Sequence, residues 1–243
     1  MKRLLTAAAL ACVATAPFAA STTLTGTVRD FASDGVNFEG VITGLKTGLV
    51  APTLTGPSPT LTAFGATVIE PGNFSQWFTK TTNNVAVSLT LNETFAGSGI
   101  YSYSNNSFFP IDGTELGNEG FPHNYHFTYA IGAQFGYKPG TGQTFSFTGD
   151  DDVWVFFDKK LGIDLGGVHG ATSASVNLDT LLAGHAEGNY SFDFFFAERH
   201  YSESNLSIST SLTLAPVPEP SAWALMAIGL AGVGFAARRA QPR

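Results

Sequence analysis

The stretch Thr144-Phe145-Ser146-Phe147-Thr148-Gly149-Asp150-Asp151-Asp152-Val153-Trp154-Val155-Phe156-Phe157 decides the fold class. Residues 144–148 alternate polar and apolar side chains, which is the period-two pattern of a half-buried strand. Residues 153–157 form an unbroken apolar run that ends at Asp158-Lys159-Lys160, and residues 161–165 can return as its hairpin partner. The sequence therefore predicts neighbouring strands close to a run of three aspartates.

The same alternation recurs along the chain. It predicts further strands at 26–31, 85–91, 125–130, 189–197 and 206–214. Residues 49–59 and 97–120 are rich in turn formers and predict loops, and only 73–80 and 173–183 favour short helices. The prediction is an all-β fold, an antiparallel β-sandwich of jelly-roll-like form, with long loops and one or two short helices.

The N-terminus predicts a signal peptide over residues 1–20. Basic Lys2 and Arg3 precede an apolar run, Leu4 to Val13, and small residues follow up to Ser21. Cleavage there removes Cys12, which is the single cysteine, so disulfide chemistry is not expected. A lipoprotein signal around Cys12 is the alternative interpretation.

The C-terminus predicts a removable tail, residues 216–243. Val217-Pro218-Glu219-Pro220-Ser221 precedes a short apolar run, Ala222 to Ala237, and then Arg238, Arg239 and Arg243. This order resembles the PEP-CTERM sorting signal. The resemblance implies processing by an exosortase-type enzyme and transient inner-membrane contact through a short transmembrane segment. Display at the cell surface or in the extracellular matrix of a Gram-negative bacterium would follow. An ordinary tail anchor is the alternative.

The predicted mature domain, residues 21–215, is acidic. Between Ser21 and Pro218 the sequence has seven basic and eighteen acidic residues, a net charge of −11. Such a surface repels phosphate backbones, so a nucleic-acid partner is not expected. Divalent cations and neutral glycans are better suited to it.

Several motifs between about Gly26 and Thr210 together resemble the fibro-slime domain family. The motifs are Gly26-Thr27-Val28-Arg29-Asp30-Phe31, Phe38-Glu39, Phe74 with Trp77, Phe108-Phe109-Pro110-Ile111-Asp112-Gly113, His123-Asn124, Phe147 to Phe156, Asp164 to Gly170, and Phe195 to His200 with Ser204-Asn205. That family looks like a branch of the protective-antigen-type β-sandwich lectins. In those relatives two adjacent aspartates, joined by a cis peptide, hold a calcium that binds sugar hydroxyls. The resemblance places this pair at Asp150/Asp151 or Asp151/Asp152, and we favour the second because it directly precedes a strand.

The residues themselves also favour a cation. Three consecutive carboxylates repel one another, and hard oxygen ligands without a thiolate favour calcium. Calcium takes roughly 6–8 oxygens, so other loops must contribute. We predict Asp150, Asp151, Asp152 and Asn205 as metal ligands, with Asp164 and Glu198 as further candidates near the ligand. The alternative is a solvated turn at Gly149.

Other side chains suggest contacts with a bound sugar. Trp154, Trp77 and Tyr201 could stack on sugar rings, although Trp154 lies in an apolar run and could equally be core. His200 adjoins the acidic motifs and completes the predicted ligand-binding set with Asp164, Trp154 and Glu198. His123 and His126 have an HxxH spacing, but hydrogen-bonded structural roles are commoner for such histidines than zinc ligation.

These observations predict an exported, non-enzymatic module that binds carbohydrate or mediates adhesion with the help of calcium. Extracellular polysaccharide or another glycan is its expected partner. The first alternative is a structural matrix protein without a small ligand. The second is a glycoside-acting enzyme that uses a carboxylate pair such as Asp152 and Glu198, although the sequence cannot supply the separation that such a pair needs.

Overall fold

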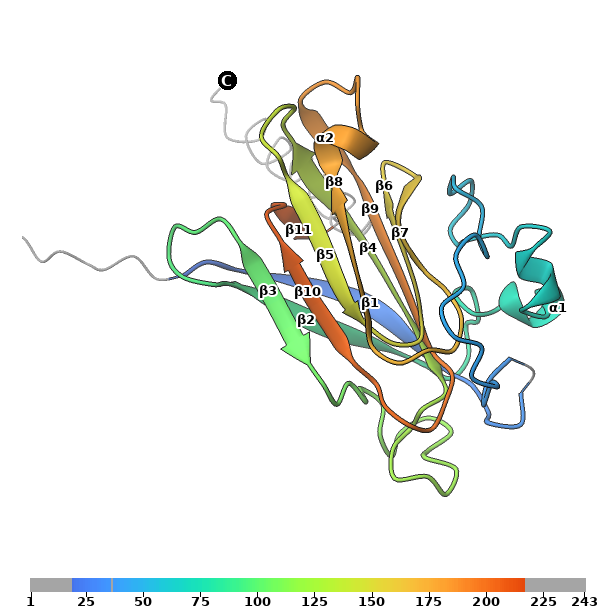
Figure 1. Cartoon of the computed structure of the whole chain (residues 1–243). Helices are drawn as coiled ribbons and strands as arrows, with labels where there is room; N and C mark the ends of the chain where they lie inside the picture. The colour runs from blue at the N-terminus through green and yellow to red at the C-terminus, as the bar shows by residue number, and fades with distance from the viewer. Residues whose placement is uncertain (1–18, 36, 217–243) are drawn as a thin grey trace, which may run out of the picture.

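The computed structural model describes residues 19–35 and 37–216 (Figure 1). The predicted tail from Val217 onward and nearly all of the predicted signal peptide, including Cys12, lie outside these residues. Within the described part, no helix is long and apolar enough to cross a membrane. The predicted short transmembrane segment, Ala222 to Ala237, lies outside it.

The chain forms strands connected by long loops and very short helices. The strands are β1 (Ser21–Asp30), β2 (Asn84–Glu93), β3 (Tyr101–Asn105), β4 (Phe127–Tyr137), β5 (Thr144–Gly149), β6 (Asp152–Phe157), β7 (Lys160–Leu165), β8 (Thr172–Asn177), β9 (Gly188–Glu198), β10 (Leu206–Thr210) and β11 (Leu214–Pro216). The helices are α1 (Pro71–Phe74), α2 (Leu178–Leu181) and a single 3-10 turn, Gly65–Thr67.

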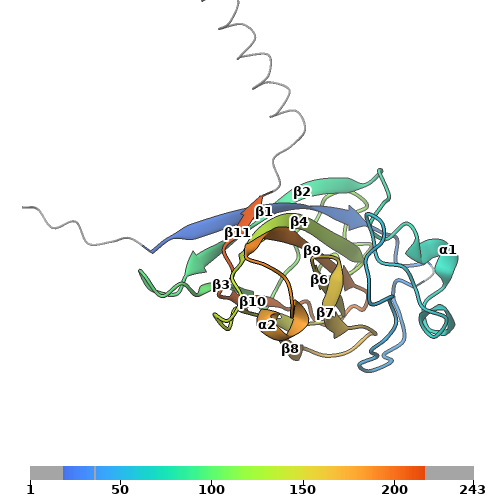
Figure 2. The same cartoon turned by 90° about the horizontal axis from the view of Figure 1, so that it is seen from above.

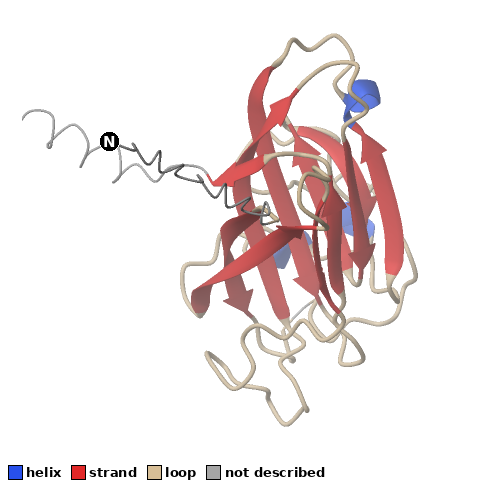
Figure 3. Ribbon diagram, turned by 90° about the vertical axis from the view of Figure 1, so that its left-hand side faces the viewer, coloured by secondary structure: helices blue, strands red, loops and turns tan. Residues whose placement is uncertain are grey.

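All the strands join one antiparallel sheet that curls back on itself. Its order is β7-β6-β9-β4-β1-β2-β3-β10-β5-β8, and β11 pairs with β4. Seen from above, the curl produces two facing layers, and the end strands β7 and β8 come together (Figure 2). The predicted all-β antiparallel fold is confirmed, and its two layers belong to one continuous sheet. Figure 3 shows the nearly closed, barrel-like form from the side.

Two apolar cores account for this architecture. The larger fills the space between the layers with inward side chains such as Phe145, Phe147, Phe194 and Phe196. The smaller lies on the outer side of β6 and β9, where Trp154 packs beneath the segment that carries α1. Because β6 contacts a core on each face, all of its side chains are buried, which explains its unbroken apolar run.

Three local predictions are wrong. The helix predicted at 73–80 is instead α1, which covers only Pro71–Phe74. Residues 173–177, predicted as helix, belong to β8, where exposed Ser173 and Ser175 alternate with half-buried Ala174 and Val176. The helix begins only after Asn177, whose side chain accepts a hydrogen bond from Thr180 N. In the predicted loop 97–120, β3 forms because its two tyrosines pack on the main core.

Candidate functional site

Strand register brings distant acidic segments together at one rim of the barrel. Asp150 and Asp151 form the turn between β5 and β6. Gly149 is paired with Leu206, so Asp150 lies beside Asn205. Asp152 is paired with Ala197 on β9, so the aspartates also approach Glu198 and Arg199. The sheet therefore gathers the predicted metal ligands from three parts of the chain.

Each aspartate has its own hydrogen-bond partners. Asp150 accepts from Asn205 N at 2.5 Å and from Asn205 Nδ2 at 2.7 Å. Asp151 accepts from the backbone N–H groups of His169 and Arg199, both at 3.0 Å. Asp152 accepts from Gly167 N and from the Arg199 Nε, both at 2.6 Å. All three side chains are buried, so the alternative of a solvated turn is wrong.

These contacts distinguish the two candidate ligand pairs. The peptide bond between Asp150 and Asp151 is cis. Asp152 is fully buried, and one of its oxygens is ion-paired with Arg199. Asp150 and Asp151, but not Asp152, line the adjoining pocket. The accessible pair is therefore Asp150/Asp151 rather than Asp151/Asp152.

The site contains more buried acidic side chains than buried basic ones. Burial raises the pKa of Asp150, and burial together with the neighbouring Asp152 raises that of Asp151 to about 8. Burial also raises the pKa of Glu198 well above its usual range, with further contributions from Asp151 and Asp150. Among the described residues, the only buried lysine or arginine is Arg199, whose Nε faces Asp152. The remaining three carboxylates lack a comparable counter-charge.

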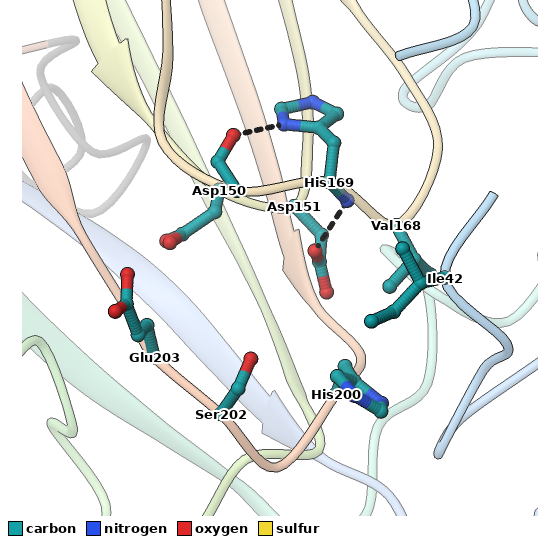
Figure 4. Close-up of a pocket in the computed structure, with 9 residues that line it drawn as sticks. Ile42, Asp150, Asp151, Val168, His169, His200, Ser202 and Glu203 are labelled. Atoms are coloured by element: carbon teal, nitrogen blue, oxygen red, sulfur yellow. Dashed lines mark hydrogen bonds between the residues drawn. The ribbon is translucent and has the colours of Figure 1, made fainter. Parts of the chain in front are cut away.

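A pocket of about 260 Å³ opens over this cluster (Figure 4). Asp150 and Asp151 form one wall, Ser202 and Glu203 lie across from them, and His200 lies at the base of the view. The side chain of Ile42 enters from the opposite side, next to Val168. The pocket thus has an acidic wall and an aliphatic wall.

Three of the four predicted ligand-binding residues, Trp154, Asp164 and Glu198, do not line this pocket. Trp154 is fully buried in the smaller core, so it cannot stack on a sugar. Asp164 accepts hydrogen bonds from Trp154 Nε1 at 3.2 Å and from Gly48 N at 2.7 Å, which hold a loop in place. Trp77 is likewise fully buried. His200 lines the pocket as predicted, whereas Glu198 lies beneath it with an exposed fraction of 1%.

The histidines are held by nearby acids. His126 Nε2 lies 2.8 Å from Glu39 Oε2, and His200 Nδ1 lies 3.1 Å from Glu39 Oε1. His123 pairs with Asp112 at 2.6 Å. In the described residues no group of three or more His, Cys, Asp or Glu side chains is arranged to hold a metal ion, and this applies to the HxxH histidines and to Asp150, Asp151 and Glu198 alike.

Sequence reasoning missed several residues of the site: Arg199, Ile42 and, in the pocket lining, Ser202 and Glu203. Arg199 enters the motifs only as part of Phe195 to His200, whereas its guanidinium neutralises Asp152. The sequence feature that could have revealed this role is a single arginine directly after the buried strand β9. Ile42 lies in a loop far from the motifs, and no sequence signal connects it with them.

The Asp150 and Asp151 carboxylates offer the oxygen donors that a hard cation takes, and Asn205, which donates from Nδ2 to Asp150, would join them by turning its amide oxygen toward the ion. Two carboxylates and one amide oxygen fall short of the coordination that calcium requires, so backbone oxygens, water or ligand hydroxyls must complete it. One observation favours such an ion: Glu198 Oε2 is buried without a hydrogen-bond partner in the described structure. A buried, unpartnered carboxylate oxygen is costly unless positive charge lies nearby.

Comparison with known proteins agrees with the motifs. A PEP-CTERM protein-sorting motif matches residues 216–240. Protein psiQ of Dictyostelium discoideum is 43% identical over 190 residues, which are 70% of this chain and 19% of psiQ. Protein psiD of the same organism is 40% identical over 188 residues, or 70% of this chain and 36% of psiD. The chain thus spans well under half of either relative.

A solved structure gives a more distant likeness. The PA14 domain of the MpAFP antifreeze protein matches with a TM-score of 0.36 and 11% identity, over 76% of this chain and 80% of that one. The PEP-CTERM motif implies export and sorting to the surface or the extracellular space. The chain is therefore a homologue of the psi proteins, a fibro-slime-like family, and it ends in a PEP-CTERM sorting motif, as the sequence predicts.

Proposed function

We propose that this protein is an exported, non-enzymatic module that binds carbohydrate with the help of calcium at the Asp150/Asp151 pocket. The observation that carries the proposal is the set of three buried carboxylates, Asp150, Asp151 and Glu198, beneath an open pocket. A divalent cation would supply the missing positive charge. It would also bind sugar hydroxyls directly.

The residues of this chain have distinct roles in the proposal. Asp150, Asp151 and Asn205 hold the ion, and Glu198 adds negative charge from below. Arg199 keeps Asp152 neutralised and donates its backbone N–H to Asp151. The Arg199 contact thereby leaves the other two aspartates available to the pocket.

The pocket lining favours a neutral sugar. Glu203 adds another carboxylate across from Asp150 and Asp151, so an anionic sugar would be repelled unless its charged group bound the ion directly. Ser202 and His200 offer hydrogen-bonding groups, and Ile42 and Val168 offer an aliphatic surface for the C–H face of a sugar ring.

Calorimetric titration of the protein with calcium tests the ion site. We expect saturable binding that is lost in Asp150→Asn/Asp151→Asn and retained in Asp34→Asn, because Asp34 is an exposed acid outside the pocket. Equal heats of calcium binding and equal melting temperatures in all three proteins would contradict the proposed calcium site. A glycan array probed with calcium and with chelator then tests sugar binding separately.

The proposal that the protein is not an enzyme rests on the carboxylate geometry. Asp152 is fully buried against Arg199, and Glu198 is almost completely buried, so this predicted pair does not present two carboxyl groups to a substrate. Release of reducing sugar from a bound glycan, abolished by Glu198→Gln, would contradict the proposal.

We further propose that the tail contacts the inner membrane only transiently and that the mature protein resides in the surface polysaccharide. The support is the sorting motif over residues 216–240. Cell fractionation tests it: a variant in which Pro218, Glu219 and Pro220 are replaced by alanine should accumulate in the membrane fraction. Unchanged distribution of that variant would contradict the proposal.

A further inference from the structure

The loop between β9 and β10, residues 199–205, is fixed to both aspartates of the pocket. At its start, Arg199 donates its backbone N–H to Asp151 at 3.0 Å. At its end, Asn205 donates to Asp150 from its backbone N–H and from its side chain. The position of the loop tip is therefore set by contacts with the same two aspartates that the proposed calcium site uses.

Tyr201 lies at the exposed tip of this loop. Its neighbours in the sequence, His200 and Ser202, both line the pocket (Figure 4), while 53% of the Tyr201 side chain is exposed. The centroid of the Tyr201 ring lies 4.6 Å from that of the His200 ring. The tyrosine is thus an exposed aromatic surface directly beside the pocket.

Packing fixes the orientation of the tyrosine ring. It stacks on Phe121, with centroids 5.6 Å apart and an angle of 20° between the ring planes. Phe121 in turn packs against the ring of buried His126 at 5.4 Å. On the pocket side, His200 Nδ1 lies 3.1 Å from Glu39 Oε1. Because the ring is already held in place, a ligand that contacts it has less conformational entropy to remove.

Turn formation does not account for an aromatic residue at this position. Turns are formed by Gly, Pro, Asn, Asp and Ser, whereas an exposed tyrosine offers a large, rigid contact surface at low cost in conformational entropy. Among the described residues that line the pocket there is no phenylalanine, tyrosine or tryptophan. The aromatic surface available to a ligand in the pocket therefore lies beside it, at Tyr201.

We propose that Tyr201 forms a second sugar subsite, so that the ligand is a neutral glycan of at least two sugar units. This inference rests on the calcium-assisted carbohydrate binding proposed above. One unit binds the ion through its hydroxyls, and the next unit lies beyond His200 with its C–H face on the tyrosine ring. The face of an aromatic ring carries partial negative charge, which suits the weakly positive C–H groups of a sugar.

A protein partner fits this surface less well. Exposed tyrosines do act as anchors in protein interfaces, but such anchors lie at the centre of well-packed patches that exclude water. The residues that follow Tyr201 in the loop, Ser202 and Glu203, are exposed and polar. A single ring beside a polar pocket matches one sugar unit better than it matches an apolar protein surface.

Sugars of increasing length test the second subsite. The probes are D-mannose with mannobiose, D-galactose with galactobiose, and D-glucose with cellobiose, each titrated calorimetrically in the presence of calcium. We expect at least one disaccharide to bind about 2- to 10-fold more tightly than its monosaccharide, as one added aromatic contact predicts. In Tyr201→Ala the disaccharide should bind no more tightly than the monosaccharide, and the affinity for the monosaccharide should be unchanged.

Two further variants serve as controls. Tyr201→Trp keeps an aromatic face and should preserve the tighter binding of the disaccharide. Phe95→Ala is the matched control, because Phe95 is also an exposed aromatic side chain, at 68%, but does not line the pocket. It should bind both sugars as the unmodified protein does. Calcium affinity should be equal in all three variants, since none of them changes an ion ligand, and thermal melting establishes that each one folds.

The inference is overturned if the unmodified protein binds monosaccharides and disaccharides equally, or if folded Tyr201→Ala still prefers the disaccharide. It is also overturned if Tyr201→Ala weakens calcium or monosaccharide binding to the same extent, because the tyrosine then only supports the loop. Self-association that depends on Tyr201, without an effect of sugar length, would assign the ring to a protein interface instead.

Failure of the proposed function gives a different result. If no sugar binds in calcium, the proposed carbohydrate site is contradicted and the second subsite with it. If a monosaccharide binds but length has no effect, only the second subsite is contradicted.

Discussion

Arg199 Nε lies 2.6 Å from Asp152 Oδ2, and the two side chains are 4% and 0% exposed. This is a buried ion pair at the end of two core strands. Removing one partner of such a pair leaves an uncompensated charge in a medium of low polarity. We therefore expect Arg199→Met to lower the free energy of unfolding by about 3–5 kcal/mol, measured by urea denaturation.

Arg199→Lys serves as the control for this prediction. It retains the positive charge but loses the planar guanidinium, which also donates from Nη1 to Asn37 O at 3.2 Å. We expect an intermediate loss of stability. If Arg199→Met were as stable as the unmodified protein, Asp152 would have to be protonated or solvated, contrary to the structure.

The stability of the calcium-free protein should fall as the pH rises. The pKa of Asp151 is raised from 3.8 to about 8, so the folded state retains a proton that the unfolded chain has already lost. The resulting stabilisation is complete below the unfolded pKa and is lost as the pH rises through the folded one. Burial raises the pKa of Asp150 and Glu198 as well, which acts in the same direction.

Urea denaturation in chelator at about pH 5 and about pH 8 measures this dependence on either side of neutrality. Asp151→Asn should reduce the change in the free energy of unfolding between these two pH values, and Asp34→Asn should leave it unchanged. Added calcium should restore stability at the higher pH, because the ion binds the deprotonated carboxylate. A slope that is identical in the unmodified protein and in Asp151→Asn would contradict the assigned role.

The alternation of polar and apolar residues predicted the strands well wherever one face of a strand is exposed to solvent. The pattern of 144–148 is matched by β5, in which Phe145 and Phe147 are buried and Thr148 is exposed. It was less informative in β3, because the decisive contacts of Tyr101 and Tyr103 are with a core assembled from distant strands. The second core was not predictable either, since nothing local shows that the segment around α1 covers Trp154.

The motifs predicted the site's location but not its division of roles. They placed Asp150, Asp151 and Asn205 at one rim, and the register of β5 and β10 brings them together. The sequence could not show which carboxylate faces Arg199 and which face the pocket, because the Arg199 contact joins residues on different strands. Trp154 remained ambiguous for the same reason, since periodicity does not show which face of β6 is covered.

Glu198→Gln should stabilise the calcium-free protein. The change keeps the shape of the side chain and replaces a carboxyl group that burial keeps from ionising and whose Oε2 has no hydrogen-bond partner in the described structure. Unsatisfied buried polar groups cost about 1–3 kcal/mol, and 1 kcal/mol corresponds to about 2–4 °C in melting temperature for a domain of this size. Thermal melting in chelator checks the gain.

The same substitution should weaken calcium binding, because it removes negative charge beneath the ion. Glu203→Gln is the matched control: it neutralises a pocket carboxylate nearer to the surface and should leave the melting temperature in chelator almost unchanged. A lower melting temperature for Glu198→Gln in chelator would show that this carboxylate is satisfied by a contact absent from the structure.

Trp154→Ala should lower the free energy of unfolding, because Trp154 is a core residue. Trp154 is fully buried, and it packs against Phe74 and Trp77 with ring centroids 5.8 and 6.5 Å apart. Truncation of a buried tryptophan costs about 3–5 kcal/mol. Tyr201→Ala, at a side chain exposed by 53%, should change the free energy of unfolding by less than about 1 kcal/mol. Urea denaturation of both variants distinguishes core from surface, and equal effects would contradict the assignment.

Gly149→Ala should damage the ion site through the backbone. A Cβ at this position would overlap the Asn205 carbonyl oxygen and the ring of Phe147. Relief of the overlap must move Asn205, which donates to Asp150 from both its backbone and its side chain. We expect calcium affinity to fall about 10- to 100-fold, as for other residues that orient metal ligands, with a stability loss of about 1–3 kcal/mol.

Gly132→Ala is the matched control for this glycine. Gly132 also lies within a strand, β4, but a Cβ there would meet no atom within 4 Å. Calorimetric titration of both variants with calcium should therefore show weakened binding only for Gly149→Ala. If that variant bound calcium as tightly as Gly132→Ala, the position of Asn205 against Asp150 would not matter for the ion, and the ligand set would have to exclude Asn205.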